Sequence, residues 1–391
     1  MGEVLDRLRV ENGIARHAPT FVALRRDIHQ HPELSFHEHR TSALVAQHLR
    51  EWGYEVFTGI AGTGVVGRLK KGQGGKTLGL RADMDALPIQ ETTGLPYASQ
   101  HPGVMHACGH DGHTAILLAA ARFLAEEGQF DGTLHLIFQP AEEIGAGAKK
   151  MIAEGLFERF PCDAVYGLHN WPGVRAGHLG CVDGPAMASI DYAKVTITGH
   201  GGHGAEPHRA VDPVLATAHL ITALQSVVSR NVDPLEMGVV TVGSIHGGVA
   251  ANVIPDSVEL RLTARSFKPE VRAVIKERVP ALAKAQAESL GAHAEVDFQN
   301  GFPPVINHPR ETAFARDVAR DALGDDFVDP HFRPRTASED FAYLLQARPG
   351  SFLFLGNGDS ASLHNPRYDF NDAVLAPAAA YWAHLVERYL S

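Results

Sequence analysis

The sequence TLHLIFQPAEE, residues 133–143, joins an apolar run directly to a proline and two glutamates. Its first seven residues have the composition of a buried β-strand. Four other runs of this kind alternate with helical patterns along the chain: residues 65–69, 77–81, 164–168 and 351–355. Strands that alternate with helices predict an α/β domain, here with an open mixed sheet flanked by helices.

The segment between residues 183 and 298 follows a different pattern. Its strands and helices are predicted in the order βαββαβ: residues 191–198, 211–230, 237–245, 258–266, 269–290 and 293–298. This order is the ferredoxin-like arrangement. We therefore expect residues 1–182 and 299–391 to form one catalytic domain and residues 183–298 to form a second domain inserted into it.

Composition narrows the range of functions. The 391 residues include 35 basic and 45 acidic side chains, a formal net charge of −10, and no basic run. This balance argues against nucleic acid or an anionic membrane as the main partner. Three cysteines cannot form a disulfide framework in so long a chain, and the first ten residues lack the apolar core of a signal peptide. We therefore expect a cytoplasmic protein without a membrane span.

Reactive side chains follow the predicted strands at the point where each one ends. Asp83 follows residues 77–81, Glu142 and Glu143 follow residues 133–139, and two histidines occupy the same place after later strands: His169 and His364. In open α/β sheets, ligands bind beyond the carboxyl ends of the strands. Four distant segments therefore converge on one candidate site.

A glycine-rich loop, CGHDGH at residues 108–113, precedes a long predicted helix, which covers residues 113–127. Cys108 and His110, two residues apart, can reach one metal ion, whereas His113 reads as a helix-start residue. The candidate ligands are a mixture of thiolate, imidazole and carboxylate groups, and there are too many of them for one tetrahedral ion. This favours an open catalytic site with two metals about 3.5–4 Å apart.

Simpler interpretations exist for several of these residues. Cys108 could be a small buried apolar residue, or a nucleophile paired with a histidine. His135 lies within a strand pattern and fits a core position. Four histidines near the start of the chain have a spacing that resembles a metal-binding motif: His29, His31, His37 and His39. They follow no predicted strand, so the alternative is that they occupy helix ends and surface positions.

Eight motifs occur in order across nearly the whole chain: RADMDALP, MHACGHDGHTA, FQPAEE, LHNWP, GHGGHGAEPH, ANVIPD, SEDFA and HNPRYDFND. Together they closely resemble the aminoacylase/carboxypeptidase family of metal-dependent amidohydrolases. The resemblance is strongest to the branch that contains hippurate hydrolase, bacterial N-acyl-amino-acid amidohydrolases and plant auxin-conjugate hydrolases. It implies hydrolysis of the amide bond of N-acyl amino acids.

The resemblance also implies roles for individual residues. Five side chains would ligate two divalent ions, Zn²⁺ first and otherwise Mn²⁺, Co²⁺ or Ni²⁺: Cys108, His110, Glu143, His169 and His364. Glu142 would be the general base toward a metal-activated water, and Asp83 would lie behind a metal ligand. In the inserted lid domain, His203 would stabilise the reacting carbonyl, often from a partner subunit, and Asn252 would hold the substrate carboxylate. A homodimer or homotetramer formed through the lid is implied.

The sequence departs from the family pattern at a few positions. Arg81 stands where many relatives have a ligating histidine, Ile144 and Ala337 stand where glycine is common, and His200 and Gly204 replace lysine and alanine. None of these changes removes a proposed ligand, but they leave the acyl group and amino acid of the substrate open. A dipeptidase or aminopeptidase on the same scaffold, a non-catalytic metal-binding protein and a cysteine-nucleophile hydrolase are the alternatives.

Overall fold

The computed structural model describes residues 2–329 and 331–391. The chain divides into two compact units. Unit 1 consists of Met1–Gly184, Ile306–Arg333 and Asp340–Ser391, and unit 2 of Pro185–Val305 and Pro334–Glu339. The chain crosses between them in the short strands β7 (Gly184–Met187) and β14 (Val305–Asn307).

Unit 2 extends beyond the predicted segment 183–298 at its carboxyl end. The N–H of Ile190 donates to the carbonyl of Phe302, and that of Gly301 donates to Asp191. The N–H of Ala188 donates to the carbonyls of Arg335 and Ala337, which adds residues 334–339 to this unit. These backbone contacts join segments that are distant in sequence, so no local pattern marks them.

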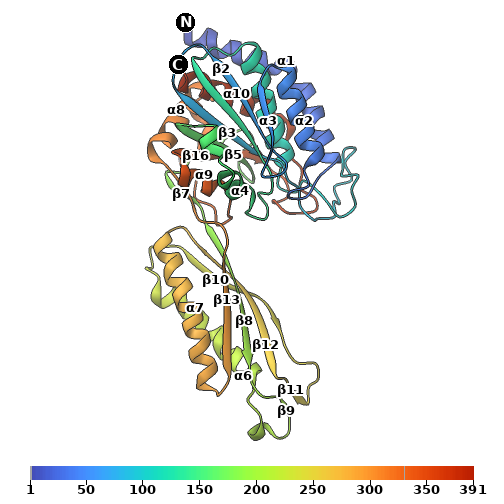
Figure 1. Ribbon diagram of the computed structural model, residues 1–391, viewed down its shortest axis with the longest axis vertical. Helices are drawn as coiled ribbons and strands as arrows, with labels where there is room; N and C mark the ends of the chain where they lie inside the picture. Colours follow the sequence, from blue (N-terminus) through green and yellow to red (C-terminus); the bar gives the residue numbers. More distant parts are fainter. Residues whose placement is uncertain (1, 330) are drawn as a thin grey trace. The chain divides into compact units, whose positions relative to one another are not determined.

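Unit 1 is built on a mixed sheet. Among the described residues this sheet has eight strands, in the order β1-β2-β4-β3-β5-β16-β6-β15 (Figure 1). The strands are β1 (Glu55–Ile60), β2 (Gly64–Lys71), β3 (Thr77–Asp83), β4 (Gly132–Gln139), β5 (Ala164–Pro172), β6 (Leu179–Gly180), β15 (Val328–Asp329) and β16 (Gly350–Gly358). The helices are α1 (Gly2–Gln30), α2 (His39–Glu51), α3 (His110–Glu126), α4 (Gly147–Ala153), α5 (Leu156–Arg159), α8 (Pro309–Leu323), α9 (Phe341–Ala347) and α10 (Leu375–Tyr389), with the short 3-10 helices η2 (Asp325–Phe327) and η3 (Asp372–Val374).

The four central strands run parallel. Strand β3 pairs in parallel with β4 and β5, and β5 with β16, so their carboxyl ends share one edge. Asp83, the last residue of β3, lies opposite Gln139, the last residue of β4. The prediction of an α/β fold with a mixed sheet flanked by helices is confirmed, and the register brings the residues that follow β3 and β4 together.

Helix α1 continues through Pro19, which lies inside it. Its buried residues Val10, Ile14 and Phe21 continue one apolar stripe past Pro19 and belong to the same core as α3 and α10. Proline removes one helical hydrogen bond, which favours a break when the sequence is considered alone. Here burial of the apolar stripe compensates for that loss.

Unit 2 has the ferredoxin-like arrangement. Its main elements are β8 (Ser189–Thr198), α6 (Pro213–Asn231), β10 (Gly238–His246), β12 (Ser257–Ser266), α7 (Pro269–Ser289) and β13 (His293–Asn300), with smaller elements β9 (Gly202–His203), η1 (Pro207–Arg209) and β11 (Val253–Ile254). The sheet order is β10-β12-β8-β13, with all neighbours antiparallel. Alternate residues of β8, among them Val195 and Ile197, pack with Leu220 and Ile275 of the two helices.

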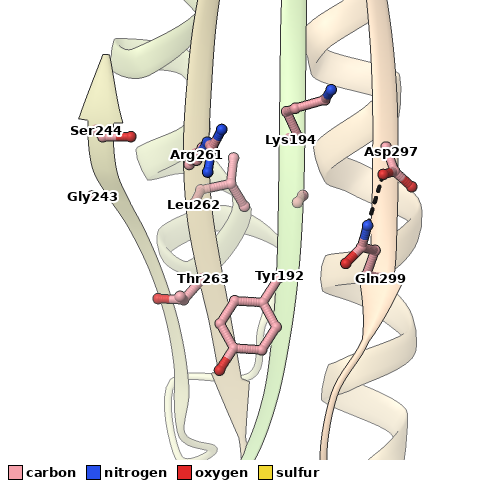
Figure 2. A pocket seen from close by; sticks show the side chains of 10 residues that line it. Tyr192, Lys194, Gly243, Ser244, Arg261, Leu262, Thr263, Asp297 and Gln299 are labelled. Carbon is pink, nitrogen blue, oxygen red and sulfur yellow. Dashed lines mark hydrogen bonds between the residues drawn. The ribbon is translucent and has the colours of Figure 1, made fainter. Parts of the chain in front are cut away.

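The other face of this sheet is polar. Figure 2 shows Tyr192, Lys194 and Arg261 on adjacent strands, beside Asp297 and Gln299 of β13. A shallow hollow on this face is lined by none of the site residues predicted from the sequence. Within the described part of the chain, we find no helix with both the length and the apolar character needed to cross a membrane.

Candidate metal centre

The predicted ligands of unit 1 lie at the carboxyl edge of its parallel strands. Glu142 and Glu143 follow β4, and His364 follows β16. His169 was expected beyond its strand but lies within β5, because that strand continues its pairing with β16 as far as Pro172. Cys108 lies just before α3, and His110 is the first residue of that helix.

Three of these residues form a buried group. The ligand atoms of Cys108, His110 and His169 all lie within 4.8 Å of one another. The Sγ atom of Cys108 is 3.3 Å from Nε2 of His169. A thiolate and an imidazole bound to one tetrahedral zinc are about 3.6 Å apart, given the usual bond lengths. The separation in the structure therefore fits two ligands of a single ion.

A second group shares Cys108 with the first. It combines Cys108 with Glu143 and His364, again with ligand atoms within 4.8 Å. Oε2 of Glu143 is 3.5 Å from Nε2 of His364, and Oε1 of Glu143 is 3.9 Å from Nε2 of His110. The five predicted ligands are thus brought together in unit 1 as two overlapping sets.

Two buried atoms in the centre have no hydrogen-bond partner among the described residues: Nε2 of His110 and Oε1 of Glu143. Nδ1 of His110 lies 2.8 Å from the backbone carbonyl of Asp85 and donates to it, so in the neutral ring, the form that binds a metal, the lone pair is on Nε2. An unpaired buried polar atom costs about 1–3 kcal/mol, and such atoms are rare in native proteins. A divalent cation between these two atoms would satisfy both, so the residues fit a metal.

Burial and charge shift the pKa values of the ligands strongly. Burial raises the pKa of Glu143 to about 8. Burial alone would lower the pKa of His110, but the carboxylates of Asp83, Glu143 and Asp85 raise it to about 10. Burial also lowers the pKa of His169 well below its usual range, and the nearby His113 ring adds to this effect. A neutral imidazole is the form of histidine that binds a metal.

Asp83 lies beside the centre, with Oδ2 3.7 Å from Nε2 of His110, but both of its oxygens already accept hydrogen bonds. Its Oδ1 accepts a hydrogen bond from Nδ1 of His113 at 2.6 Å, and its Oδ2 accepts one from Arg81 at 2.7 Å. Burial by itself raises the pKa of Asp83, but His110, His113 and Arg81 lower it well below its usual range. The carboxylate is therefore ionised and already engaged by donors.

Arg81 acts as a fixed internal cation. Besides Asp83, its guanidinium donates to Gln139 Oε1 at 2.9 Å and to Asp340 Oδ1 at 3.1 Å. A guanidinium remains protonated in proteins and has no lone pair for a metal. Arg81 is therefore a structural cation in this chain and not a metal ligand.

A series of hydrogen bonds fixes the ring of His113, and the sequence did not reveal it. Because Nδ1 of His113 donates to Asp83, its Nε2 accepts from the backbone N–H and from Nδ2 of Asn170, both at 3.0 Å. Oδ1 of Asn170 accepts from the Tyr368 hydroxyl at 2.5 Å, and its Nδ2 also donates to the Cys108 carbonyl at 2.6 Å. His113 and Asn170 thus orient the loop of Cys108. Their membership of the MHACGHDGHTA and LHNWP motifs was the available signal.

The early histidines do not join the centre. His29 lies 2.8 Å from Oδ2 of Asp111, and Nδ1 of His31 contacts the backbone carbonyl of Asp27. Among the described residues, none of the four early histidines belongs to a group able to hold a metal ion. His135 is buried, with Nδ1 3.6 Å from Sγ of Cys162, in agreement with a core position.

The two predicted lid residues lie together in unit 2. His203, at the end of β9, pairs with Val253 of β11, and the N–H of Gly204 donates to the Asn252 carbonyl at 2.8 Å. The His203 side chain is exposed, and its Nδ1 accepts from the N–H of Ala205 at 3.1 Å. Its Nε2 therefore carries the hydrogen of the neutral ring and can act as a donor.

Comparison with known proteins places these features in a family. The model of peptidase family M20/M25/M40 matches residues 79–388. Hippurate hydrolase of Campylobacter jejuni is 45% identical over 370 residues, which cover 95% of this chain and 96% of the relative. N-acetyl-L-cysteine deacetylase of Bacillus subtilis is 44% identical over 371 residues, with 94% and 88% covered.

A solved structure agrees with these relatives. The Bacillus subtilis YXEP protein, a dinuclear metal binding peptidase from the M20 family, superimposes with a TM-score of 0.84 at 34% identity and covers 96% of this chain and 99% of its own. The resemblance expected from the eight motifs is confirmed. From the match over most of its length, this chain belongs to peptidase family M20/M25/M40.

Proposed function

We propose that this protein is a metal-dependent amidohydrolase that cleaves N-acyl amino acids into a carboxylic acid and a free amino acid. One observation carries the proposal: Cys108, His110 and His169 converge beside the adjacent glutamates Glu142 and Glu143. The relatives described above are named for the hydrolysis of hippurate and the deacetylation of N-acetyl-L-cysteine, and both compounds are N-acyl amino acids.

Two divalent ions are the proposed cofactors. Their ligands would be Cys108, His110, Glu143, His169 and His364. A thiolate among imidazole ligands favours Zn²⁺, and the imidazole and carboxylate ligands also accept Mn²⁺, Co²⁺ or Ni²⁺. Ions bound here would polarise the scissile carbonyl and lower the pKa of a water molecule.

Glu142 is the proposed general base. Its carboxylate takes a proton from the attacking water while the water oxygen bonds to the carbonyl carbon, and it later gives this proton to the nitrogen as the C–N bond breaks. Glu142 is 5% exposed, so bulk water does not compete freely for the proton. Glu143 cannot replace it, because the Glu143 carboxylate faces His110 and His364.

Supporting roles follow from the hydrogen bonds described above. Asp83 fixes the ring of His113, which in turn fixes the main chain around Asn170. His203 would donate from Nε2 to the carbonyl oxygen as negative charge develops there, and such donors typically contribute about 2.7–4 kcal/mol. Asn252 would donate its side-chain amide to the carboxylate of the substrate.

Assembly and location are further parts of the proposal. We propose a homodimer or homotetramer formed through unit 2, with His203 supplied to the site of the partner subunit. Sedimentation velocity of the metal-loaded protein tests this, and a monomer at assay concentration would contradict it. All three cysteines are buried thiols without a disulfide in the part of the chain that the structure describes, which supports the cytoplasm as the location.

The test of the activity is amine release from a panel of N-acyl amino acids with benzoyl, acetyl, indole-acetyl and long-chain acyl groups. The protein is assayed after chelator treatment and again after addition of Zn²⁺ or Mn²⁺. We expect activity to disappear with the metal and to return with it. If the metal-loaded protein released no amine from this panel but hydrolysed dipeptides, the result would favour a dipeptidase or aminopeptidase. Activity that resists the chelator but is abolished by alkylation would favour a cysteine nucleophile.

A further inference from the structure

The two glutamates of the proposed site lie on a turn that other carboxylates hold in place. Ala141, just before them, has a φ of 52°, a left-handed backbone conformation that alanine rarely adopts. Its N–H donates to Oε1 of the buried Glu38 at 2.9 Å. The N–H of Gly145 donates to the carbonyl of Glu142 at 2.7 Å and closes the turn. The directions of both glutamate side chains therefore depend on the bonds that fix this backbone.

Asp85 accepts two of the hydrogen bonds that hold this turn. Its Oδ1 accepts from the N–H of Glu142 at 3.1 Å, and its Oδ2 accepts from the N–H of Glu143 at 3.0 Å. The Ser35 hydroxyl donates to Oδ2 at 2.6 Å, and the side chain of Asp85 is 1% exposed. The two oxygens of one carboxylate thus hold two consecutive amides.

The main chain of Asp85 adds a third connection. Its carbonyl accepts from Nδ1 of His110 at 2.8 Å, which leaves Nε2 of that ring directed toward the carboxylates of Asp83 and Glu143. A single residue beyond the end of β3 therefore contacts the backbone of the proposed base, the backbone of one proposed ligand and the ring of another.

We propose that Asp85 is a positioning residue that sets Glu142 and Glu143 at the working distance from the substrate and the ions. This inference rests on the proposed function, in which Glu142 is the base. Bonds from amides to a buried carboxylate are charge-assisted, and they hold geometry well. An asparagine has the same shape but only one acceptor oxygen, so one of the two amides would face an NH₂ group.

The test is Asp85→Asn in the full-length, metal-loaded protein. We expect kcat to fall about 10- to 100-fold, as is usual for residues that orient a metal site, with KM within about twofold of wild type. Metal content, measured by elemental analysis, should remain that of the wild type. Asp163→Asn is the matched control, because Asp163 accepts from the backbone N–H of Thr77 at 2.7 Å at the opposite end of β3. Wild-type kcat in Asp85→Asn would overturn the proposal.

A double-mutant cycle separates positioning from general destabilisation. If Asp85 acts through Glu142, Asp85→Asn should cause little further loss of turnover in the Glu142→Gln background. A loss of the same factor in both backgrounds would overturn the proposal, because it would mean that Asp85 acts independently of the base. High activity of Glu142→Gln alone would instead refute the proposed function, so the two failures are distinguishable.

Ser35→Ala provides a second variant if Asp85→Asn does not fold. It retains the carboxylate but removes one of the hydrogen bonds that orient Oδ2. We expect kcat to fall severalfold while the thermal unfolding midpoint of the protein stays within about 2 °C of wild type. Unchanged kcat in this variant would overturn the proposal.

Discussion

His29, near the end of α1, is expected to be a charged residue inside the folded protein. Its Nδ1 lies 2.8 Å from Oδ2 of Asp111, and its Nε2 lies 3.4 Å from the carboxylate of Glu91. Burial by itself lowers the pKa of His29 and the nearby Arg25 lowers it further, but Asp111 and Glu91 together raise it to about 9. The ring therefore donates from both nitrogens at neutral pH.

The size and direction of the effect on stability follow from this shift. The unfolded chain releases the proton near pH 6.5, whereas the folded protein retains it until about pH 9. At 1.36 kcal/mol per pH unit, this difference corresponds to about 3 kcal/mol of unfolding free energy. The contribution is fully present below pH 6.5 and is lost as the pH rises from 6.5 through 9, because only the folded state still binds the proton in that interval.

Urea unfolding of the metal-free protein at pH 6 and at pH 9.5 measures this contribution. Trp52, Trp171 and Trp382 all lie in unit 1, so tryptophan fluorescence follows the unit that contains His29. We expect wild type to lose about 3 kcal/mol more than His29→Gln between the two pH values. His31→Gln is the control, because His31 is only half-buried and contacts a backbone carbonyl. Equal losses in wild type and His29→Gln would refute the reasoning.

The remaining predictions concern catalysis. Glu142→Gln should bind both ions by elemental analysis yet lose at least about 100-fold in kcat, the usual contribution of a general base, and near-normal turnover would contradict this. If His203 acts on the partner's site, a mixture of His203→Ala and Glu142→Gln subunits should be more active than either variant alone. No recovery of activity, with subunit exchange demonstrated, would assign His203 to the site of its own chain. Ile144 is 59% exposed beside Glu143; Ile144→Gly should raise KM about tenfold for benzoyl substrates and little for acetyl substrates, and equal changes for both would argue against contact with the acyl group.

The strands and the edge that carries the site could be predicted from the sequence because their signals are local. The largely apolar run of seven residues before Pro140 marks β4 almost to the residue. Parallel pairing of β3, β4, β5 and β16 then requires that Asp83, the glutamate pair and His169 meet at one edge. Here periodicity and topology together decide the arrangement, with no need for side-chain detail.

The residues that fix the site could not be predicted in the same way. Glu38 lies 103 positions along the chain from Ala141, whose N–H donates to it. Asp85 lies 57 and 58 positions from Glu142 and Glu143, whose N–H groups donate to it. Asn170 is 62 positions from the carbonyl of Cys108. In each case one partner is a backbone group, which every residue possesses and which therefore leaves no mark on the sequence.

The contrast between Asp83, Asp85 and Glu143 shows what distinguishes a supporting carboxylate from a ligand. All three are acidic side chains at one edge of a sheet, and motif membership alone does not separate them. Asp83 and Asp85 have both oxygens occupied by donors, from Arg81 and His113 in one case and from two amides in the other. Glu143 retains a buried oxygen to which none of the described residues donates. Because such an oxygen is costly unless a cation satisfies it, the number of donors around a buried carboxylate indicates its role better than its position in a motif does.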